Sequence, residues 1–329
     1  MSSPLPQRTD RRAGMEHLRA VLGVDWTYFD AADKGSDLVK HAMAQVHAVR
    51  KSALLDVHGG GFLPGEDSVQ LPFDWPDTEV DAPVPFLERN FSSTHSLQPG
   101  YDPYDDTVTT LMEAKQNFTV VRYRPGLHPY EYVPLGPVAC YHSHKAVIEA
   151  TASSSLPSLI LEDDVDFDVD IKEQLRTVWH LLPPDWDIVF LGHCWGDEER
   201  YPALFSLTPL PADLPPSRIT VHPSHRPLCN HGYAVSPAGA RRLARYLNHP
   251  PFAYSRAIDQ LVKWLILHNR IKSFSIMPFV ITQFKLGNYK SDLISDVPDL
   301  YDWRLTKGIL AGEYERKQEA DLEQQARDS

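Results

Sequence analysis

Short apolar runs alternate with helical patterns through the second half of the chain, and this alternation constrains the fold more than any other feature. Residues 158–161 (SLIL) and 187–192 (DIVFLG) are almost wholly apolar, which is typical of strands that are buried on both faces. Residues 171–182 carry helical periodicity between them. The pattern predicts an α/β fold with a mainly parallel central sheet and helices on both faces.

The same signals predict elements along the rest of the chain. Helices are expected over 10–23, 36–49, 137–151, 237–247 and 257–268, and strands over 26–30, 231–236 and within 274–283. Thr9 or Asp10 is the expected cap of the first helix, and Ser36 that of the second. Pro137 is expected at the first position of its helix, where its missing N–H has no intrahelical partner.

Length and composition set the domain organisation. With 329 residues, of which 42% are hydrophobic, the chain can bury one large core. Residues 56–116 are rich in Pro, Gly and Asp and are interpreted as an insertion or long loop. We therefore predict one domain over 1–311, followed by a charged tail over 312–329.

The charge balance excludes two classes of partner. The chain has 32 Lys and Arg against 44 Asp and Glu, a formal net charge of −12. Such an acidic balance gives no general affinity for nucleic acid or for anionic membranes. No apolar run approaches the ~20 residues of a membrane span. We expect a soluble protein without a membrane span in this chain.

Signals of cellular location are few. The first twelve residues contain no apolar signal-peptide core. Three cysteines (Cys140, Cys194 and Cys229) are too few and too scattered to predict a disulfide framework. Two glycosylation sequons, at Asn90 and Asn117, point instead to a secretory lumen.

Three adjacent carboxylates follow the apolar run 158–161. In an extended chain Glu162 and Asp164 would point to one side and Asp163 to the other. Ligands of α/β sheets bind beyond the carboxyl ends of strands, and two carboxylates there can hold a hard divalent cation. A cation would offset their mutual repulsion. The alternative interpretation is a solvated acidic turn.

Other patterns suggest different chemistry. A calcium loop that starts at Glu162 would need glycine where Phe167 stands. Residues 58–62 (HGGGF) resemble the oxyanion segment of esterases, but the chain has no Gly-x-Ser-x-Gly elbow. A zinc site is a further alternative, although the spacing of its candidate ligands matches no common site. These ligands are His222, His225, Cys229 and His231.

Seven segments in order resemble glycosyltransferase family 25, the group of lipopolysaccharide and procollagen galactosyltransferases. They cover most of the chain outside the predicted insertion, and residues 190–195 and 250–260 look most like the fungal branch. The segments are 5–15, 135–147, 159–165, 185–195, 231–243, 257–265, and Gln283 followed by 290–294.

The resemblance implies a GT-A type nucleotide-sugar-binding fold and a metal-dependent inverting glycosyltransferase. This enzyme would move a hexose, usually galactose, from a UDP-sugar to a glycan or protein hydroxyl. Glu162 and Asp164 would then bind Mn²⁺ or Mg²⁺, with Asp163 contributing to cofactor binding. The cation would neutralise the charge that develops on the diphosphate. The alternative is a catalytically degenerate sugar-nucleotide or glycan-binding protein of the same fold.

Further site residues follow from the residues and the resemblance together. Three arginines at the first helix start suit a phosphate, because helix N-terminal amides also favour an anion. Inversion needs a general base, and the resemblance assigns that role to Asp259. Asp292 is expected near the metal, and Lys285 and Lys290 near phosphate. The arginines are Arg8, Arg11 and Arg12.

One departure from the family bears on activity and location. The family has an apolar strand directly before the segment 5–15, whereas only four residues precede Leu5 here. We therefore expect either a longer native chain or a reduced donor site. The family and the sequons indicate the secretory pathway or the Golgi, although this chain carries no signal or anchor.

Overall fold

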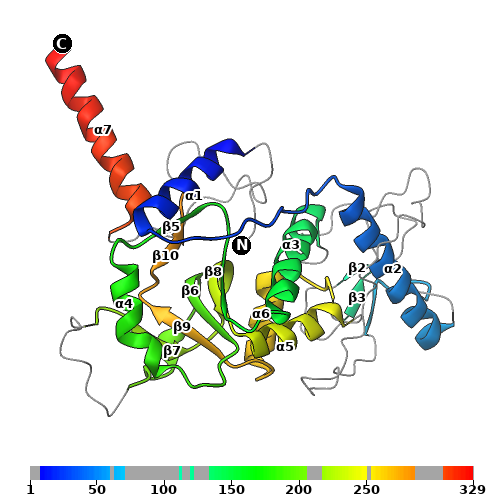
Figure 1. Ribbon diagram of the computed structural model, residues 1–329. Coiled ribbons are helices and arrows are strands. Elements are labelled where there is room, and N and C mark those ends of the chain that lie inside the picture. The colour runs from blue at the N-terminus through cyan, green and yellow to red at the C-terminus, as the bar shows by residue number, and fades with distance from the viewer. Residues whose placement is uncertain are drawn as a thin grey trace. The chain divides into compact units, whose positions relative to one another are not determined.

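The computed structural model describes most of the chain and divides it into two compact units. The described residues are 8–59, 63–70, 111–112, 119–121, 133–205, 217–249, 253–285 and 307–328. Unit 1 comprises Met1–Asp30, Pro157–Ser236 and Asn269–Ser329, and unit 2 comprises Ala31–Leu156 and Pro237–His268. Figure 1 labels most of their elements.

Unit 1 is built on a five-stranded sheet with the order β4-β8-β6-β9-β7. Its strands are β4 (Ser158–Leu161), β6 (Ile188–Cys194), β7 (Thr220–Pro223), β8 (Leu228–Val235) and β9 (Ser273–Met277). A separate two-stranded sheet pairs β5 (Val165–Phe167) with β10 (Ile281–Gln283). The expected α/β class and the strands at 158–161 and 187–192 are thus confirmed.

The prediction of a mainly parallel sheet is wrong. Among the described strands of this sheet, β6–β9 is the one parallel pair, and the pairs β4–β8, β6–β8 and β7–β9 are antiparallel. Every residue of β6 is buried, with Ile188, Val189 and Phe190 each 0% exposed. The continuous apolar run therefore indicates a strand that is buried on both faces. Burial of this kind does not determine whether the strand is parallel or antiparallel to its neighbours.

The helices of unit 1 share one apolar core with the strands. They are α1 (Thr9–Leu22), α4 (Ile171–Val178) and α7 (Ile309–Asp328), with short 3-10 turns at Trp179–Leu181 and Glu198–Arg200. Leu18 of α1, Val178 of α4 and Ile309 of α7 join Val189 and Ile276 of the strands in one apolar core. Burial of these side chains is the main source of stability for the unit.

The predicted end of helix α1 is confirmed, and its predicted caps are not. Gly23 ends it in a left-handed conformation, φ 56°, which glycine adopts without steric cost. The predicted caps Thr9 and Asp10 are wrong, since the cap position is Arg8 and no side chain caps the helix. The strand expected over 26–30 is also absent from the described structure, where only Asp30 forms a bridge.

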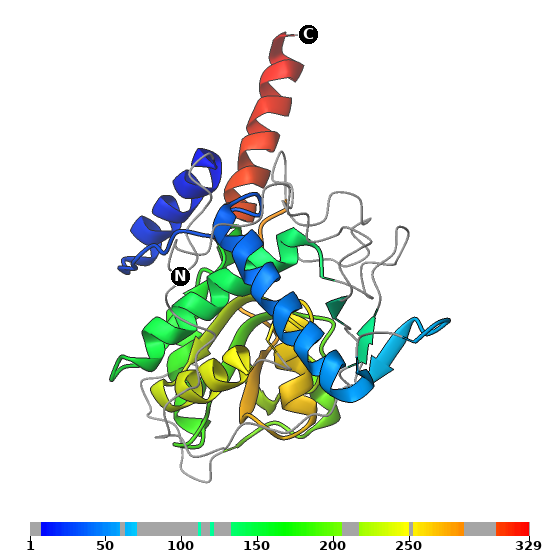
Figure 2. The same ribbon diagram turned by 90° about the vertical axis from the view of Figure 1, so that its right-hand side faces the viewer.

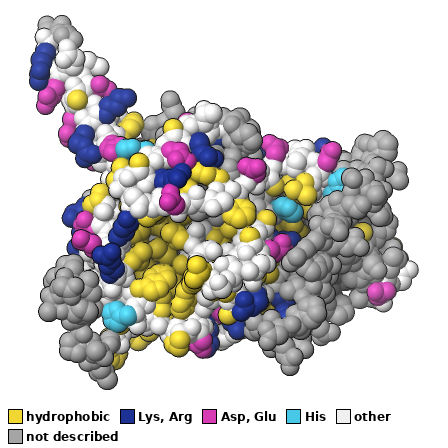
Figure 3. All heavy atoms as spheres, in the orientation of Figure 1, with side chains coloured by type: hydrophobic (Ala, Val, Ile, Leu, Met, Phe, Trp, Pro, Cys, Tyr) yellow, Lys and Arg dark blue, Asp and Glu magenta, His cyan; other side chains and the backbone are white. Residues whose placement is uncertain are grey.

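Strand β5 anchors the C-terminal helix. Asp166 is 1% exposed and accepts hydrogen bonds from the N–H groups of Leu310 and Ala311, at 2.9 and 3.0 Å. These amides belong to the first turn of α7 and have no intrahelical acceptor. Beyond this turn α7 is exposed and densely charged, as Figure 3 shows. The expected tail is thus a helix that is held at its first turn.

Unit 2 contains four helices and a small antiparallel sheet among its described residues. The helices are α2 (Asp37–His58), α3 (Leu135–Ala152), α5 (Pro237–Asn248) and α6 (Ile258–Leu267), and the strands are β1 (Ser68–Gln70), β2 (Leu111–Met112) and β3 (Thr119–Val121). Helix α2 crosses α3 (Figure 2). Tyr141 of α3 donates a hydrogen bond to the Leu247 carbonyl of α5 at 3.0 Å.

Predicted helix starts in unit 2 are partly confirmed. The Ser36 hydroxyl accepts a hydrogen bond from the Val39 N–H at 3.4 Å, as a cap does. Pro137 is the third residue of α3, because the helix begins two residues earlier than expected. Proline is tolerated there because first-turn amides lack intrahelical acceptors. Most of the insertion 56–116, including most of HGGGF, lies outside the described residues. Asn90 and Asn117 of the two sequons lie outside them as well.

A disulfide bond corrects the expectation drawn from cysteine number. Cys194 at the end of β6 is bonded to Cys229 near the start of β8, with their Cα atoms 5.5 Å apart. Thirty-five positions separate them in sequence, and strand pairing brings them together. Cys140 takes no part in this disulfide. No helix among the described residues is long and apolar enough to cross a membrane.

Removing the Asp166 carboxylate should release α7 from unit 1. We expect Asp166→Ala to lower the free energy of unfolding by about 1–2 kcal/mol, the range for loss of a helix cap. Urea denaturation measures this loss, and limited proteolysis should cut α7 earlier in the variant. Asp321→Asn, an exposed change on α7, is the control. Unchanged stability in both variants would contradict the anchoring role.

Candidate functional site

The three carboxylates lie in a turn between β4 and β5. The Glu162 N–H still bonds to the His231 carbonyl at 3.0 Å, which extends the β4–β8 pairing by one residue. The chain then turns at Asp163 and Asp164 before β5 begins. The expected alternation of side chains therefore stops at Glu162, and the directions predicted for the two aspartates do not hold.

Arg11 of α1 neutralises part of this acidic turn. Its guanidinium lies 2.7 Å from Asp163 Oδ1 and 3.4 Å from Asp164 Oδ2. The three side chains are 8%, 13% and 14% exposed, so the ion pairs are shielded from solvent. Sequence reasoning placed Arg11 on a phosphate, whereas the structure brings it to the two aspartates.

Asp164 carries the most perturbed carboxyl group of the turn. Burial, and next the charge of Glu162, raise the pKa of Asp164 to about 7, against the opposing effect of Arg11. Burial also raises the pKa of Asp163, although Arg11 opposes that shift. The Asp164 Oδ1 atom is buried and accepts no hydrogen bond within the described structure. An unpaired buried carboxylate oxygen is what a bound cation would satisfy.

Strand β10 and the residues after it face the turn. The Gln283 side-chain amide donates a hydrogen bond to Glu162 Oε2 at 3.1 Å. The Phe284 N–H donates to the Asp164 carbonyl, and the Lys285 charge lowers the pKa of Asp164. Lys285 thus lies close enough to the acidic turn for its charge to act on Asp164, and its contact with phosphate stays a prediction.

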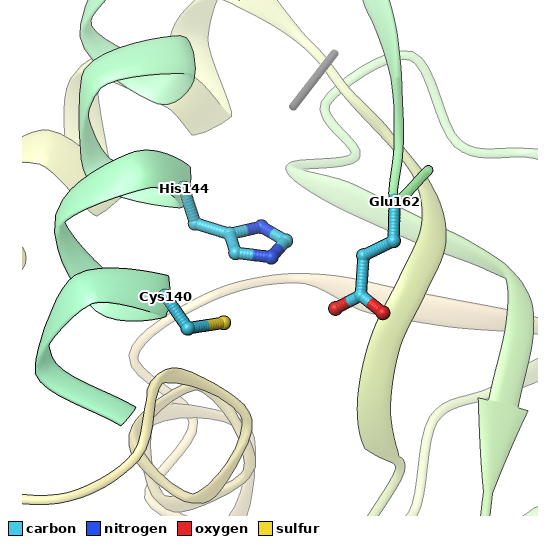
Figure 4. Close-up of side chains that lie close together, drawn as sticks. All are labelled: Cys140, His144 and Glu162. Carbon is cyan, nitrogen blue, oxygen red and sulfur yellow. The ribbon is translucent and has the colours of Figure 1, made fainter. Parts of the chain in front are cut away.

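The residues present fit a divalent cation. Glu162 and Asp164 supply the carboxylate oxygens that Mn²⁺ and Mg²⁺ prefer. Figure 4 shows the Glu162 carboxylate just beyond β4 of unit 1. In unit 2, Cys140 and His144 lie on successive turns of α3, and both are residue types that bind metals. The turn therefore offers a candidate metal site.

The other predicted arginines contact different groups. The Nε and Nη2 atoms of Arg8 each donate to the Asp10 carboxylate at 3.0 Å, which lowers the pKa of Asp10 to about 2. The Arg12 guanidinium lies 3.3 Å from the centre of the Tyr28 ring. Neither is seen on the acidic turn, and their phosphate-binding role stays a prediction.

The roles of three further residues stay predictions. Asp259 is the second residue of α6 in unit 2, and its Oδ1 accepts a hydrogen bond from the Gln260 N–H at 2.7 Å. That contact is typical of a carboxylate at a helix start. Lys290 and Asp292 lie outside the described residues.

Two neighbours of the turn were missed as site residues. Gln283 belongs to the family-like segments, but nothing in its local pattern signals a contact 121 positions away. His231 is 0% exposed, and burial lowers its pKa to about 4. The negative charge of Glu162 opposes this shift. Sequence reasoning grouped His231 only with the zinc alternative.

Two alternative metal sites lose their ligands. Cys229 is in the disulfide and cannot ligate zinc as a thiolate. Asp166, the fifth position of a calcium loop that starts at Glu162, accepts hydrogen bonds from the amides of α7. Each alternative, already disfavoured by the sequence, therefore has one candidate ligand engaged elsewhere.

Comparison with known proteins adds a distant similarity. No protein-family model matches the chain. It is 27% identical over 181 residues to procollagen galactosyltransferase 1-B of Xenopus laevis, a match that covers 52% of this chain and 27% of that protein. It is 25% identical over 198 residues to procollagen galactosyltransferase 1-A of the same organism, covering 57% and 30%. The matched part thus spans less than a third of either relative, and supports a distant galactosyltransferase-like relationship.

Removing the Arg11 charge should destabilise the protein. Arg11→Gln leaves two largely buried aspartates without their ion pair, and we expect a loss of ~3 kcal/mol in the free energy of unfolding. Urea denaturation at pH 7 measures it. Arg19→Gln is the matched control on the same helix, because Arg19 is 40% exposed in surface pairs and should change little. Equal losses would contradict a special role for Arg11.

Removing the Asp164 charge should stabilise the metal-free protein at alkaline pH. Because the folded-state pKa lies near 7 and the ordinary value is 3.8, the folded state binds the proton more tightly. Stability from this group is therefore lost as pH rises through 7. In chelator, the melting temperature of Asp164→Asn should exceed that of wild type at pH 8 and approach it at pH 5. Parallel curves would contradict the raised pKa.

Proposed function

We propose that this protein is a metal-dependent inverting glycosyltransferase that moves a hexose, galactose in the first instance, from a UDP-sugar to a glycan or protein hydroxyl. The observation that carries the proposal is the buried, unpaired Asp164 carboxylate oxygen beside Glu162, at the carboxyl end of β4. The similarity to two procollagen galactosyltransferases supports the reaction class. A GT-A type fold of family 25, fungal branch, is part of this proposal.

The electrostatics of the turn support the division of roles. Glu162 and Asp164 would hold Mn²⁺ or Mg²⁺, and the cation would supply positive charge to a leaving diphosphate. Arg11 holds Asp163 and Asp164 in place and keeps the turn from carrying three unbalanced charges. Lys285, with Lys290 and Asp292 beyond the described residues, would extend the site toward phosphate and metal.

Proton transfer completes the reaction. Displacement with inversion requires a base that takes the proton of the acceptor hydroxyl. Asp259 is our candidate for that base, and Arg8 and Arg12 are further candidates for phosphate contact. A glycan or glycoprotein is the proposed acceptor.

The cellular location proposed is the secretory pathway. The Cys194–Cys229 disulfide supports it, since such bonds persist in oxidising compartments. The sequons at Asn90 and Asn117 point the same way. The Golgi is the proposed compartment within that pathway.

A screen of UDP-sugars for Mn²⁺-dependent turnover tests the proposal. We expect hydrolysis or transfer with UDP-galactose, reversed by chelator, and a loss of at least about 100-fold in Asp164→Asn and Glu162→Gln. Asp321→Asn and Glu319→Gln carry the same chemical changes at exposed positions of α7 and should keep full turnover.

Each other outcome has a definite meaning. Turnover retained in Asp164→Asn would remove the metal role from this turn. Tight Mn²⁺-linked UDP binding without turnover of any donor would favour the degenerate binding protein. No binding of any UDP-sugar would contradict both.

A further inference from the structure

Trp195 has an unusual backbone for its residue type. Its φ angle is 50°, in the left-handed region that bulky side chains rarely adopt. Its side chain is nevertheless 54% exposed, so burial of the indole does not compensate for this conformation. A strained residue persists when its surroundings hold it, and such residues cluster at ligand sites.

A disulfide holds the residue before Trp195. Cys194 is 1% exposed and is bonded to Cys229 on the neighbouring strand. Cys229 and Arg226 also have left-handed backbones, with φ angles of 59° and 62°. The start of this turn is therefore covalently fixed to β8.

Buried hydrogen bonds hold the residues after Trp195. The Asp197 N–H donates to the His225 carbonyl at 2.9 Å. Glu198 is 1% exposed and accepts a hydrogen bond from the Ser275 hydroxyl at 2.9 Å. A Cβ at Gly196 would collide with the Glu198 carboxylate, so any other residue there would have to displace that buried side chain. Both sides of Trp195 are thus fixed, and the residue itself is 54% exposed.

Sheet topology puts Trp195 and the acidic turn at the same end of the strands, beyond the carboxyl ends of β6 and β4. Strands β4 and β6 are both antiparallel to β8, so they run parallel to each other with β8 between them. Leu161 and Gly192 both pair with Gly232 of β8, two strand spacings or ~10 Å apart. Glu162 follows Leu161 directly, and Trp195 follows Gly192 by three residues.

A buried amide lies on β8 between these two positions. Asn230 precedes His231, whose carbonyl bonds to the Glu162 N–H, and follows Cys229 of the disulfide. It is 3% exposed, and neither amide atom makes a hydrogen bond within the described structure. An unpaired amide is a donor and acceptor suited to hydroxyl groups.

We propose that Trp195 is a platform for a pyranose ring beside the acidic turn. The C–H bonds on one face of a hexose carry partial positive charge, and the indole face carries the matching negative quadrupole. A rigid, exposed tryptophan gives this contact with little loss of conformational entropy. The inference rests on the proposed function and adds a specificity residue to it. The ring comes from the donor hexose or from the acceptor glycan.

Calorimetry with named probes tests this platform and separates the two sources. The donor arm compares UDP with the uncleavable analogue of UDP-galactose in which CH₂ replaces the anomeric oxygen, both with Mn²⁺. The acceptor arm titrates methyl β-D-galactopyranoside into protein that holds UDP and Mn²⁺. We expect Trp195→Gly to weaken one of the two pyranose probes about tenfold or more while UDP affinity is unchanged.

The choice of variants separates binding from structure. Glycine accepts a φ of 50° without strain, so Trp195→Gly should keep or raise the melting temperature. Trp195→Phe keeps an aromatic face and should bind the pyranose within a fewfold of wild type. Phe205→Ala is the control: Phe205 is 81% exposed and follows Leu204, which bonds to β7 at the far edge of the sheet.

Three results would overturn the inference. Unchanged affinity for both pyranose probes in Trp195→Gly removes the platform. A lower melting temperature together with weaker UDP binding assigns Trp195 a structural role. Failure of the wild-type protein to bind UDP contradicts the proposed function itself, and the platform falls with it. The first of these results, with UDP binding intact, contradicts the platform alone.

Discussion

The balance between crowded carboxylates and a few positive charges governs this structure. Glu162, Asp163 and Asp164 follow a buried strand, where like charges repel strongly and water is scarce. Arg11 offsets part of that charge from 152 positions away. Burial, and next the remaining negative charge, raise the pKa of Asp164, and its Oδ1 has no hydrogen-bond partner within the described structure. Unit 1 thus keeps an energetically unfavourable cluster of carboxylates at the carboxyl end of β4, the region where α/β proteins bind ligands. Such clusters are typical of functional sites.

Local sequence signals predicted elements better than their pairing. The apolar runs at 158–161 and 187–192 are strands, and Gly23 ends α1 as expected, because burial and left-handed backbone are encoded by neighbouring residues. Strand direction was predicted wrongly, since a run buried on both faces looks alike in parallel and antiparallel sheets. The Cys194–Cys229 bond was missed because only strand pairing brings the two cysteines together.

The candidate site was predictable in kind but not in its partners. The triplet after β4 marked the carboxylates, since charge at the end of an apolar run is visible in sequence. The turn at Asp163 and Asp164 was not, because extension past Leu161 was assumed. Arg11 was placed on phosphate and Gln283 was overlooked, since contacts over 152 and 121 positions have no local signal. Such long-range contacts decide which carboxylate oxygens remain for a ligand.

Electron paramagnetic resonance of Mn²⁺ tests the central claim most directly, because free and protein-bound ions give distinct signals. With UDP present, the account predicts one bound Mn²⁺ per chain in the wild-type protein and in Asp321→Asn. Glu162→Gln and Asp164→Asn should leave the ion free at the same concentrations. Binding of equal strength in all four proteins would show that the ion is held elsewhere and would contradict the account.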